Sequence, residues 1–408
     1  MLDFLSTYGG FLLIPIISAI VGWGTNVLAI RMTFYPVEFK GIGPIGWQGI
    51  IPMKAAKMAS KAVDLITTKL MDVETQFARI DPKRVAEEMS PYLDRTARRI
   101  VNEVMDEQAP VVWKNIPKNI KEDIYKKAAA DLPSATEDLM SDVKGEIKSL
   151  FDVKALVVEE LCRDRRLLNR IFLEVGANEF RFIERSGLYF GFSFGLIQMV
   201  IWFFFPAWYI LPIAGLLVGW ATNWLAIRLI FYPEEPQKYG GVTIQGLFIK
   251  RQKEVSEGYA EIIAGNILTS SNIFYRILRG PASNRLLELV EKHVDETIDA
   301  AADVSRPWIN LFVGKKKIAR AKEIASNRFM DELPQSITYT FDYTEEALDI
   351  ENTLCTKLQE LPPSEFVGVL RPAFQEDEWK LILTGAILGM LAGVAQLLLF
   401  FQDIELPF

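Results

Sequence analysis

A membrane-spanning segment is written twice in this chain. Residues 14–36 read IPIISAIVGWGTNVLAIRMTFYP, and residues 211–233 read LPIAGLLVGWATNWLAIRLIFYP. The two copies align with each other without a gap. Each copy holds about 20 nearly consecutive apolar residues, the length that crosses the hydrocarbon core of a bilayer. Duplication of a membrane helix together with its downstream segment predicts two similar halves. The seam between those halves is then the first place to look for function.

Four stretches are long and apolar enough to span a membrane: 10–34, 187–205, 209–231 and 381–401. The alternative is a set of buried helices in a soluble core. Four nearly charge-free runs of this length exceed what one soluble core needs, so we expect membrane spans. Between these stretches, apolar residues recur every three or four positions, which is typical of helices, and few segments show the pattern of a β-strand. The sequence therefore predicts an all-α integral membrane protein with four transmembrane helices and a helical body outside the membrane.

Positive charge lies on one side of the predicted spans. Arg31 lies at the far end of the first span and Lys40 beyond it, Arg181 and Arg185 precede the second, and the link between the second and third carries no charge. The positive-inside rule then places both large soluble segments in the cytoplasm and both termini outside. The first and third spans run in the same direction. We therefore expect two parallel repeats related by a pseudo-twofold axis along the membrane normal.

The duplication extends over the whole chain, because three glycines at four-residue spacing followed by a glutamine recur in the second and fourth spans. Helix starts are predicted at Asp81-Pro82, Ser90-Pro91 and Ser134, where N-cap residues precede apolar periodicity. The expected first repeat is 1–206, with a span at 10–34, a cytoplasmic segment at 35–186 and a return span at 187–205. The expected second repeat is 207–408, with a span at 209–231, a cytoplasmic segment at 232–380 and a return span at 381–401.

Small residues form one face of each span, and close helix packing is their expected role. Small faces let main chains approach closely where no hydrophobic drive holds helices together. The glycines are Gly22 and Gly219 in the odd-numbered spans, and Gly187, Gly191, Gly195, Gly385, Gly389 and Gly393 in the returning spans.

Six polar residues within the spans are candidates for contact with the seam or with lipid: Asn26, Asn223, Arg31, Arg228, Gln198 and Gln396. The asparagines and the glutamines lie at different depths, so each is expected to meet its repeat counterpart across the axis. Hydrogen bonding between helices is the first interpretation, and a permeation or headgroup site is the alternative. The arginines are expected to reach the interface, with phosphate binding as an alternative. No Asp or Glu lies inside the predicted spans, which disfavours proton-coupled transport.

A basic amphipathic helix is predicted over Met53–Leu70, directly after the first span. Its lysines, Lys54, Lys57 and Lys61, alternate with apolar residues. Such a helix can lie in the headgroup layer with its lysines toward anionic lipid. An ordinary bundle helix with a solvated basic face is the equally weighted alternative.

The sequence contains no pattern typical of nucleic-acid binding, of a metal or cofactor site, or of catalysis. The net charge of −7 gives no reason to expect nucleic acid as a partner. The only histidine, His293, is expected at the surface of a charged helix, and Cys162 and Cys355 form no disulfide framework. There is no P-loop, dinucleotide fingerprint, HExxH motif or nucleophile elbow. We expect no catalytic residues, metal or cofactor, and therefore no enzyme.

The pattern GWxTNxLAIRxxFYP at 22–36 and 219–233, with LRPAFQEDEWKLI at 370–382 before a glycine-rich last span, resembles one known family. It is the group of bacterial membrane proteins called domain-of-unknown-function family 445, and the resemblance covers essentially the whole chain. It implies an integral protein of the bacterial cytoplasmic membrane with a helical cytoplasmic part. It implies no activity or substrate.

Two functions remain open from the sequence. The first is a non-enzymatic membrane scaffold or tether. Its basic helix would lie on anionic lipid, and its cytoplasmic helices would bind a protein partner or a second copy. The second is a lipid or small-solute transporter in which Asn26, Asn223, Arg31 and Arg228 line a path along the seam. A polar-poor seam suits lipid better than ions.

Overall fold

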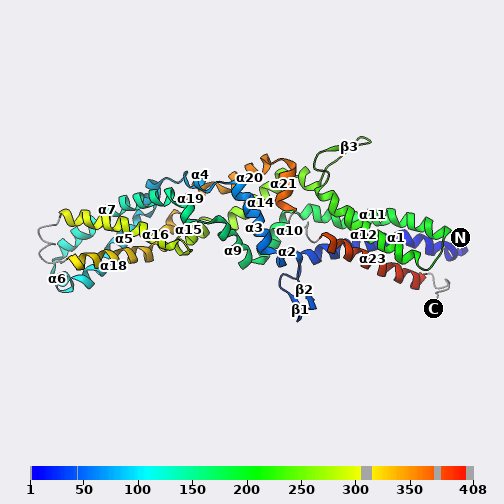
Figure 1. Ribbon diagram of the computed structural model, residues 1–408, viewed down its shortest axis with the longest axis horizontal. Coiled ribbons are helices and arrows are strands. Elements are labelled where there is room, and N and C mark those ends of the chain that lie inside the picture. The colour runs from blue at the N-terminus through cyan, green and yellow to red at the C-terminus, as the bar shows by residue number, and fades with distance from the viewer. Residues whose placement is uncertain (1, 44, 305–314, 372–377, 401–408) are drawn as a thin grey trace. The chain divides into compact units, whose positions relative to one another are not determined.

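The chain is almost entirely helical in a computed structural model that describes residues 2–43, 45–304, 315–371 and 378–400 (Figure 1). It divides into two compact units. The membrane unit comprises 1–65, 158–259 and 355–408, and the bundle unit comprises 66–157 and 260–354. Each unit takes segments from both predicted halves. The all-α prediction is confirmed.

The membrane unit contains four helices long and apolar enough to cross a membrane. They are α1 (Leu2–Phe34), α11 (Ala177–Phe204), α12 (Ile210–Phe231) and α23 (Glu378–Phe400). They lie side by side, with α1 packed along α11 and α12 along α23 (Figure 1). The two pairs meet through α11 with α12, α1 with α23 and α1 with α12. The four predicted spans are therefore present as long apolar helices.

A short β-hairpin follows each odd-numbered span, where the glycine- and proline-containing segment indicates a turn. The strands are β1 (Lys40–Ile42), β2 (Ile45–Trp47), β3 (Gln237–Tyr239) and β4 (Val242–Ile244). Both pairs are antiparallel, with Gly41 opposite Gly46 and Lys238 opposite Thr243. Gly240 and Gly241 both have positive φ in the second turn, which favours glycine over other residues.

The glutamine of the Gln-Gly pair after each hairpin holds the hairpin's base. Gln48 Nε2 donates to the main-chain oxygen of Val37 at 2.8 Å. Gln245 Nε2 donates to the main-chain oxygen of Glu234 at 3.2 Å. The same side chain thus makes the same local contact in both copies of the motif.

The glycine of the pair lies against the end of the preceding span. A Cβ on Gly49 would come within 2.6 Å of the Phe34 carbonyl carbon, and one on Gly246 within 2.7 Å of the Phe231 carbonyl carbon. Contacts this short are not made by real Cβ atoms. Both positions therefore require glycine, because the chain turns back directly onto the helix it has just left.

The helix predicted over Met53–Leu70 is three consecutive elements. It is divided into α2 (Ile50–Met53), α3 (Ala55–Leu65) and the π-helical η1 (Ile66–Leu70). Lys54 is the residue at the break. The other helices of the membrane unit, including those shared with the bundle unit, are α9 (Val153–Arg163), α10 (Arg165–Val175), α13 (Leu247–Lys250), α14 (Gln252–Asn266), α20 (Ile350–Glu360) and α21 (Pro363–Leu370).

The bundle unit is built around a four-helix bundle made of α5 (Pro82–Gln108), α7 (Lys118–Gly145), α16 (Ser283–Val304) and α18 (Lys315–Ser336). Its neighbours in order are α5 with α7, α7 with α16, α16 with α18, and α18 with α5. Each half of the sequence supplies one pair. The shorter elements are α4 (Val73–Phe77), α6 (Pro110–Asn115), α8 (Ile147–Leu150), α15 (Ser270–Arg279), η2 (Ile337–Thr340) and α19 (Phe341–Leu348).

One of the three predicted helix starts is correct. Asp81 caps α5, its carboxylate accepting from the Lys83 main-chain N–H at 3.0 Å, with Pro82 in the first turn. Ser90-Pro91 and Ser134 lie inside α5 and α7 instead. These two predictions are wrong because local capping signals do not outweigh the packing of a long amphipathic helix.

Charged contacts join the helices contributed by the two halves. Arg285 pairs with Glu146 at 2.7 Å and Lys292 with Asp142 at 2.8 Å. The hydrogen bond from Lys292 holds the pKa of Asp142 below its ordinary value against the opposing effect of desolvation. His293 is buried rather than exposed as predicted, and its Nε2 lies 2.9 Å from the same Asp142 carboxylate on the facing helix.

Candidate functional site

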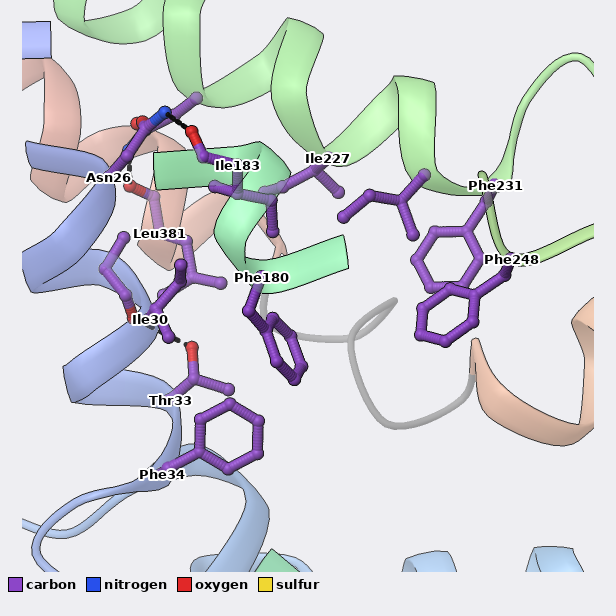
Figure 2. A pocket seen from close by; sticks show the side chains of 13 residues that line it. Asn26, Ile30, Thr33, Phe34, Phe180, Ile183, Ile227, Phe231, Phe248 and Leu381 are labelled. Atoms are coloured by element: carbon purple, nitrogen blue, oxygen red, sulfur yellow. Dashed lines mark hydrogen bonds between the residues drawn. The ribbon is translucent and has the colours of Figure 1, made fainter. Parts of the chain in front are cut away.

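The two asparagines of the odd-numbered spans line one small cavity in the membrane unit (Figure 2). Its volume is about 30 Å³, room for about two water molecules. All four spans and α13 contribute to its wall. The lining residues are Asn26, Ala29, Ile30, Thr33, Phe34, Phe180, Ile183, Asn223, Ile227, Ile230, Phe231, Phe248 and Leu381.

Two aromatic pairs form part of the cavity wall. Phe34 and Phe180 meet edge to face with ring centroids 5.1 Å apart. Phe231 and Phe248 are stacked at 5.6 Å, as Figure 2 shows. Phe34 and Phe231 are equivalent in the duplicated motif, so each half supplies one pair. The wall is therefore largely apolar, and the asparagine amides are its strongest hydrogen-bonding groups.

Each asparagine is fixed by a main-chain carbonyl of the returning span in its own half. Asn26 Nδ2 donates to Ile183 O at 2.6 Å (Figure 2), and Asn223 Nδ2 donates to Leu381 O at 2.8 Å. Both side chains are buried, at 0% and 3% exposure. Because a carbonyl only accepts, these bonds fix which way each amide points. The prediction that Asn26 and Asn223 bond each other across the axis is therefore wrong.

The amide oxygens of the same two residues have no hydrogen-bond partner in the described part of the chain. A buried acceptor left unpaired costs about 1–3 kcal/mol. Two such acceptors at one apolar cavity can accept hydrogen bonds from water or from a donor group of a ligand. Neither carries charge, so the arrangement suits a neutral donor better than a metal ion. No group of three or more His, Cys, Asp or Glu side chains is placed to hold a metal among the residues described.

Glycines bring the main chains of each helical pair into direct contact next to the asparagines. A Cβ on Gly22 would lie 2.4 Å from Gly187 O, and one on Gly219 would lie 2.1 Å from Gly385 O. These are matching positions of the two halves. Only glycine permits this approach, and the approach is what brings each asparagine within reach of a carbonyl on the facing helix.

The other predicted packing glycines continue the same contacts along the spans. A Cβ on Gly191 would lie 2.4 Å from Ser18 O, and one on Gly195 would lie 2.6 Å from Pro15 Cα. In the second pair the corresponding distances are 2.1 Å from Gly389 to Gly215 O and 2.2 Å from Gly393 to Leu211 O. All eight glycines thus lie where a side chain would collide with the facing helix.

The glutamines lie outside the cavity lining, and they differ in their side-chain contacts within the described part of the chain. Ser18 Oγ donates to Gln198 Oε1 at 3.1 Å. Gln396 is equally buried, but its Nε2 has no partner among the described residues. The difference follows from the sequence, because the residue that matches Ser18 in the second copy is Gly215.

The arginines also lie away from the cavity. Arg31 and Arg228 are exposed, and neither contributes to its lining. The guanidinium carbon of Arg228 lies 5.1 Å from the centroid of the Trp224 ring. The predicted path combining both asparagines with both arginines is therefore not formed by this cavity, and the arginines face outward.

The basic face of α3 points outward while its apolar face is buried in the protein. Lys57 and Lys61 are exposed and Lys54 is half-buried, whereas Met58 and Val63 are buried. An interfacial helix needs its apolar face free to enter the headgroup layer. Any contact of this helix with lipid would therefore use the lysines alone.

A buried ion pair beside the cavity was missed by sequence reasoning. Glu179 is 1% exposed and accepts from Arg251 Nη1 at 2.7 Å, and Arg251 also binds Glu254. Burial alone would lower the pKa of Arg251, but the hydrogen bonds to the two carboxylates raise it above its ordinary value. Phe180, the next residue after Glu179, lines the cavity. The partners are far apart in the sequence, so no local pattern could have paired them.

Four long apolar helices packed through glycine faces define an all-α membrane protein. Comparison with known proteins leads to the same class. The chain is 24% identical over 222 residues to the UPF0754 membrane protein of Bacillus pumilus (strain SAFR-032), a match that covers 48% of this chain and 54% of that protein. It is 23% identical over 193 residues to a UPF0754 membrane protein of Bacillus cereus (strain AH820), covering 45% and 50%.

A UPF0754 membrane protein of Staphylococcus epidermidis (strain ATCC 12228 / FDA PCI 1200) is 24% identical over 156 residues, covering 32% and 42%. The chain spans about half the length of the Bacillus relatives it matches. No family model and no solved structure matches it. The similarity supports a bacterial family of membrane proteins whose names state no activity. Membership in domain-of-unknown-function family 445 stays a prediction.

Proposed function

We propose that this protein is a non-enzymatic scaffold or tether of the bacterial cytoplasmic membrane. The observation that carries the proposal is the close packing of the spans. Main chains touch at matching glycines in both helical pairs, and the cavity lined by both pairs has room for only about two water molecules. Spans packed in this way serve as an anchor, and they leave no room for a solute.

The bundle unit supplies the surface that a scaffold needs. Its helices come from both halves and are joined by ion pairs, while Val111 and Val112 of α6 and Ile120 of α7 are exposed. Exposed apolar side chains on a charged bundle are a typical place for protein contact. The partner in this proposal is another protein or a second copy of the chain. The lysines of α3, Lys57 and Lys61, would add attraction to anionic lipid.

Two parallel repeats with cytoplasmic bodies and outward termini form the proposed topology. Its support is the recurrence of contacts at matching positions. Asn26 and Asn223 each bind a carbonyl of the returning span, and Gly22 and Gly219 each meet the first glycine of that span. The one-sided placement of lysine and arginine supplies the orientation.

The alternative function is movement of a lipid or small solute along the seam. It is favoured by one observation, the two unpaired amide oxygens of Asn26 and Asn223 at the cavity. A path that opens there would present two acceptors to a passing donor group.

A reconstitution experiment separates the two functions. Purified protein is placed in vesicles, and lipid scrambling and release of small entrapped solutes are measured against empty vesicles and against the variant Asn26→Leu with Asn223→Leu. The scaffold proposal predicts that all three preparations behave alike, and native mass spectrometry of the same protein should show a defined oligomer or a bound protein. Scrambling or release that the wild type catalyses and the variant loses would establish transport and refute the scaffold.

A further inference from the structure

The outward face of α12 carries a row of aromatic and cationic side chains. Trp220, Trp224 and Arg228 follow one another at four-residue spacing, so they share one helix face, and Tyr232 directly follows the end of the helix. The Trp220 and Trp224 rings are stacked with centroids 5.9 Å apart and planes inclined by only 7°. The guanidinium carbon of Arg228 lies 5.1 Å from the Trp224 centroid and 6.0 Å from the Tyr232 centroid.

A second arginine reaches the same tyrosine from another element. Arg371 follows α21, its guanidinium carbon lies 4.9 Å from the Tyr232 centroid, and its Nη1 donates to the Tyr232 hydroxyl oxygen. Its Nε is buried and has no hydrogen-bond partner in the described part of the chain. A buried guanidinium donor without an acceptor is costly, so this atom can bond to an acceptor from outside the described residues, such as a ligand.

The two positive charges are not neutralised by an ion pair with any described residue. Glu378 feels the charge of Arg371, but no carboxylate lies within ion-pair distance of Arg228 or Arg371 in the ranges that the structure describes. Two guanidinium groups near one ring repel each other, and an anion between them would remove that repulsion. The Tyr232 oxygen already accepts from Arg371, which leaves its O–H free to donate.

The position of these groups along the span indicates which kind of anion they can bind. Arg228 lies in the last turn of α12 and Tyr232 directly follows it. The end of a membrane-crossing helix lies at the level of lipid headgroups, whereas Trp220 and Trp224 lie one to two turns deeper. Exposed stacked indoles there offer a surface for the glycerol and the upper acyl chain of a lipid.

We propose that Arg228, Tyr232 and Arg371 bind the phosphate of an anionic phospholipid headgroup, with Trp224 and Trp220 against its apolar part. Guanidinium groups form charge-assisted bonds with phosphate oxygens, and two of them bracket one phosphate well. This proposal extends the proposed tether function, because it names the class of lipid that the protein binds. It rests on α12 spanning the membrane and not on the behaviour of the seam.

The first half lacks this site, which provides a matched control. There, Trp23, Arg31 and Tyr35 are kept, but Val27 stands where the second half has Trp224. The residue that matches Arg371 is Leu173, by the register that aligns Gly187 with Gly385. The equivalent arginine, Arg31, therefore has the same position in its span without the second cation.

The test is a native mass spectrometry titration of the full chain in gentle detergent with short-chain phosphatidylglycerol, phosphatidylcholine and inorganic phosphate. The wild type is expected to bind one phosphatidylglycerol in preference to phosphatidylcholine. Arg228→Gln and Arg371→Gln should each weaken that binding about fivefold, and the double variant about 25-fold. Arg31→Gln should bind like the wild type.

Three results would overturn the proposal. One is unchanged phosphatidylglycerol binding in Arg228→Gln, which alters an exposed side chain and leaves the core intact. Another is an equal loss in Arg31→Gln, which would reduce the effect to general interfacial charge. The third is binding of inorganic phosphate as tight as that of the lipid, which would assign the site to free phosphate. Because none of these variants touches Asn26 or Asn223, the outcome is distinguishable from failure of the scaffold proposal.

Discussion

Gly22→Ala should destabilise the membrane unit, whereas Gly24→Ala on the same helix should not. The added methyl at Gly22 would lie 2.4 Å from Gly187 O, 3.2 Å from Gly187 C and 3.3 Å from Gly191 Cα. All three are main-chain atoms, so no side chain can turn aside. A Cβ on Gly24 would meet nothing within 4 Å. The two substitutions therefore differ in packing alone.

The expected difference follows from these distances. A Cβ approaches a carbonyl oxygen no closer than 3.0 Å, so α1 and α11 must separate locally by at least about 0.6 Å. Overpacking of a tight contact costs about 1–3 kcal/mol. Replacing glycine by alanine inside a helix stabilises by about 0.5–1 kcal/mol wherever there is space, as at Gly24. Because helix propensity favours alanine equally at both positions, that gain cancels in the comparison, and the two variants should differ by about 1–3 kcal/mol in free energy of unfolding.

The measurement is reversible unfolding of the full chain in mixed micelles with increasing sodium dodecyl sulfate, followed by tryptophan fluorescence. Gly187→Ala provides a second reading of the same contact, and its cost should not add fully to that of Gly22→Ala, because both methyl groups open one interface. Equal unfolding free energies for Gly22→Ala and Gly24→Ala would refute the conclusion that main-chain contact at Gly22 holds the pair together.

Three further changes test other parts of the structure. Gln198→Met should lower the free energy of unfolding of the membrane unit by about 1 kcal/mol, because it removes the hydrogen bond from Ser18. Gln396→Met should be neutral or stabilising, because it removes a buried donor that has no partner among the described residues. Unfolding in detergent compares the two variants. Glu332→Gln should destabilise the bundle unit by about 2–3 kcal/mol, seen as a lower melting temperature, because this buried carboxylate accepts from Tyr92 and Arg99. Asp142→Asn should lower the melting temperature at pH 7, and the gap should close below pH 3.8, the ordinary pKa that Lys292 depresses in the folded state. A gap that instead widens in acid would contradict the Asp142 assignment.

The asparagines show how far a repeated pattern leads. Asn26 and Asn223 stand out in the sequence because a polar amide recurs at the same position in two apolar spans, and nothing in the neighbouring sequence explains it. Their partners, Ile183 O and Leu381 O, are main-chain atoms about 160 residues away. No side-chain pattern marks a carbonyl, so the sequence predicted a contact between the two amides instead.

The charged residues also show that the sequence alone does not reveal which distant residues will be in contact. His293 sits in a charged amphipathic stretch and reads as a surface residue, yet it is buried against Asp142 on a helix from the other half. Glu179 and Arg251 likewise form an ion pair that neither residue's local sequence indicates. The lysine face of α3 was recognised, but whether its apolar face met lipid or protein depended on neighbours that periodicity does not reveal.

By itself the sequence determined the properties that depend on hydrophobicity and helical spacing. These are the four spans, the glycine faces, the duplicated motif and the all-α class, because apolar length and three-to-four periodicity act locally along the chain. Only the tertiary structure decided which surfaces meet: α7 with α16, α5 with α18, and Arg371 with the tyrosine that ends α12. Such contacts join residues more than 100 positions apart. Their energies depend on close approach and on shared burial, which no local stretch of sequence contains.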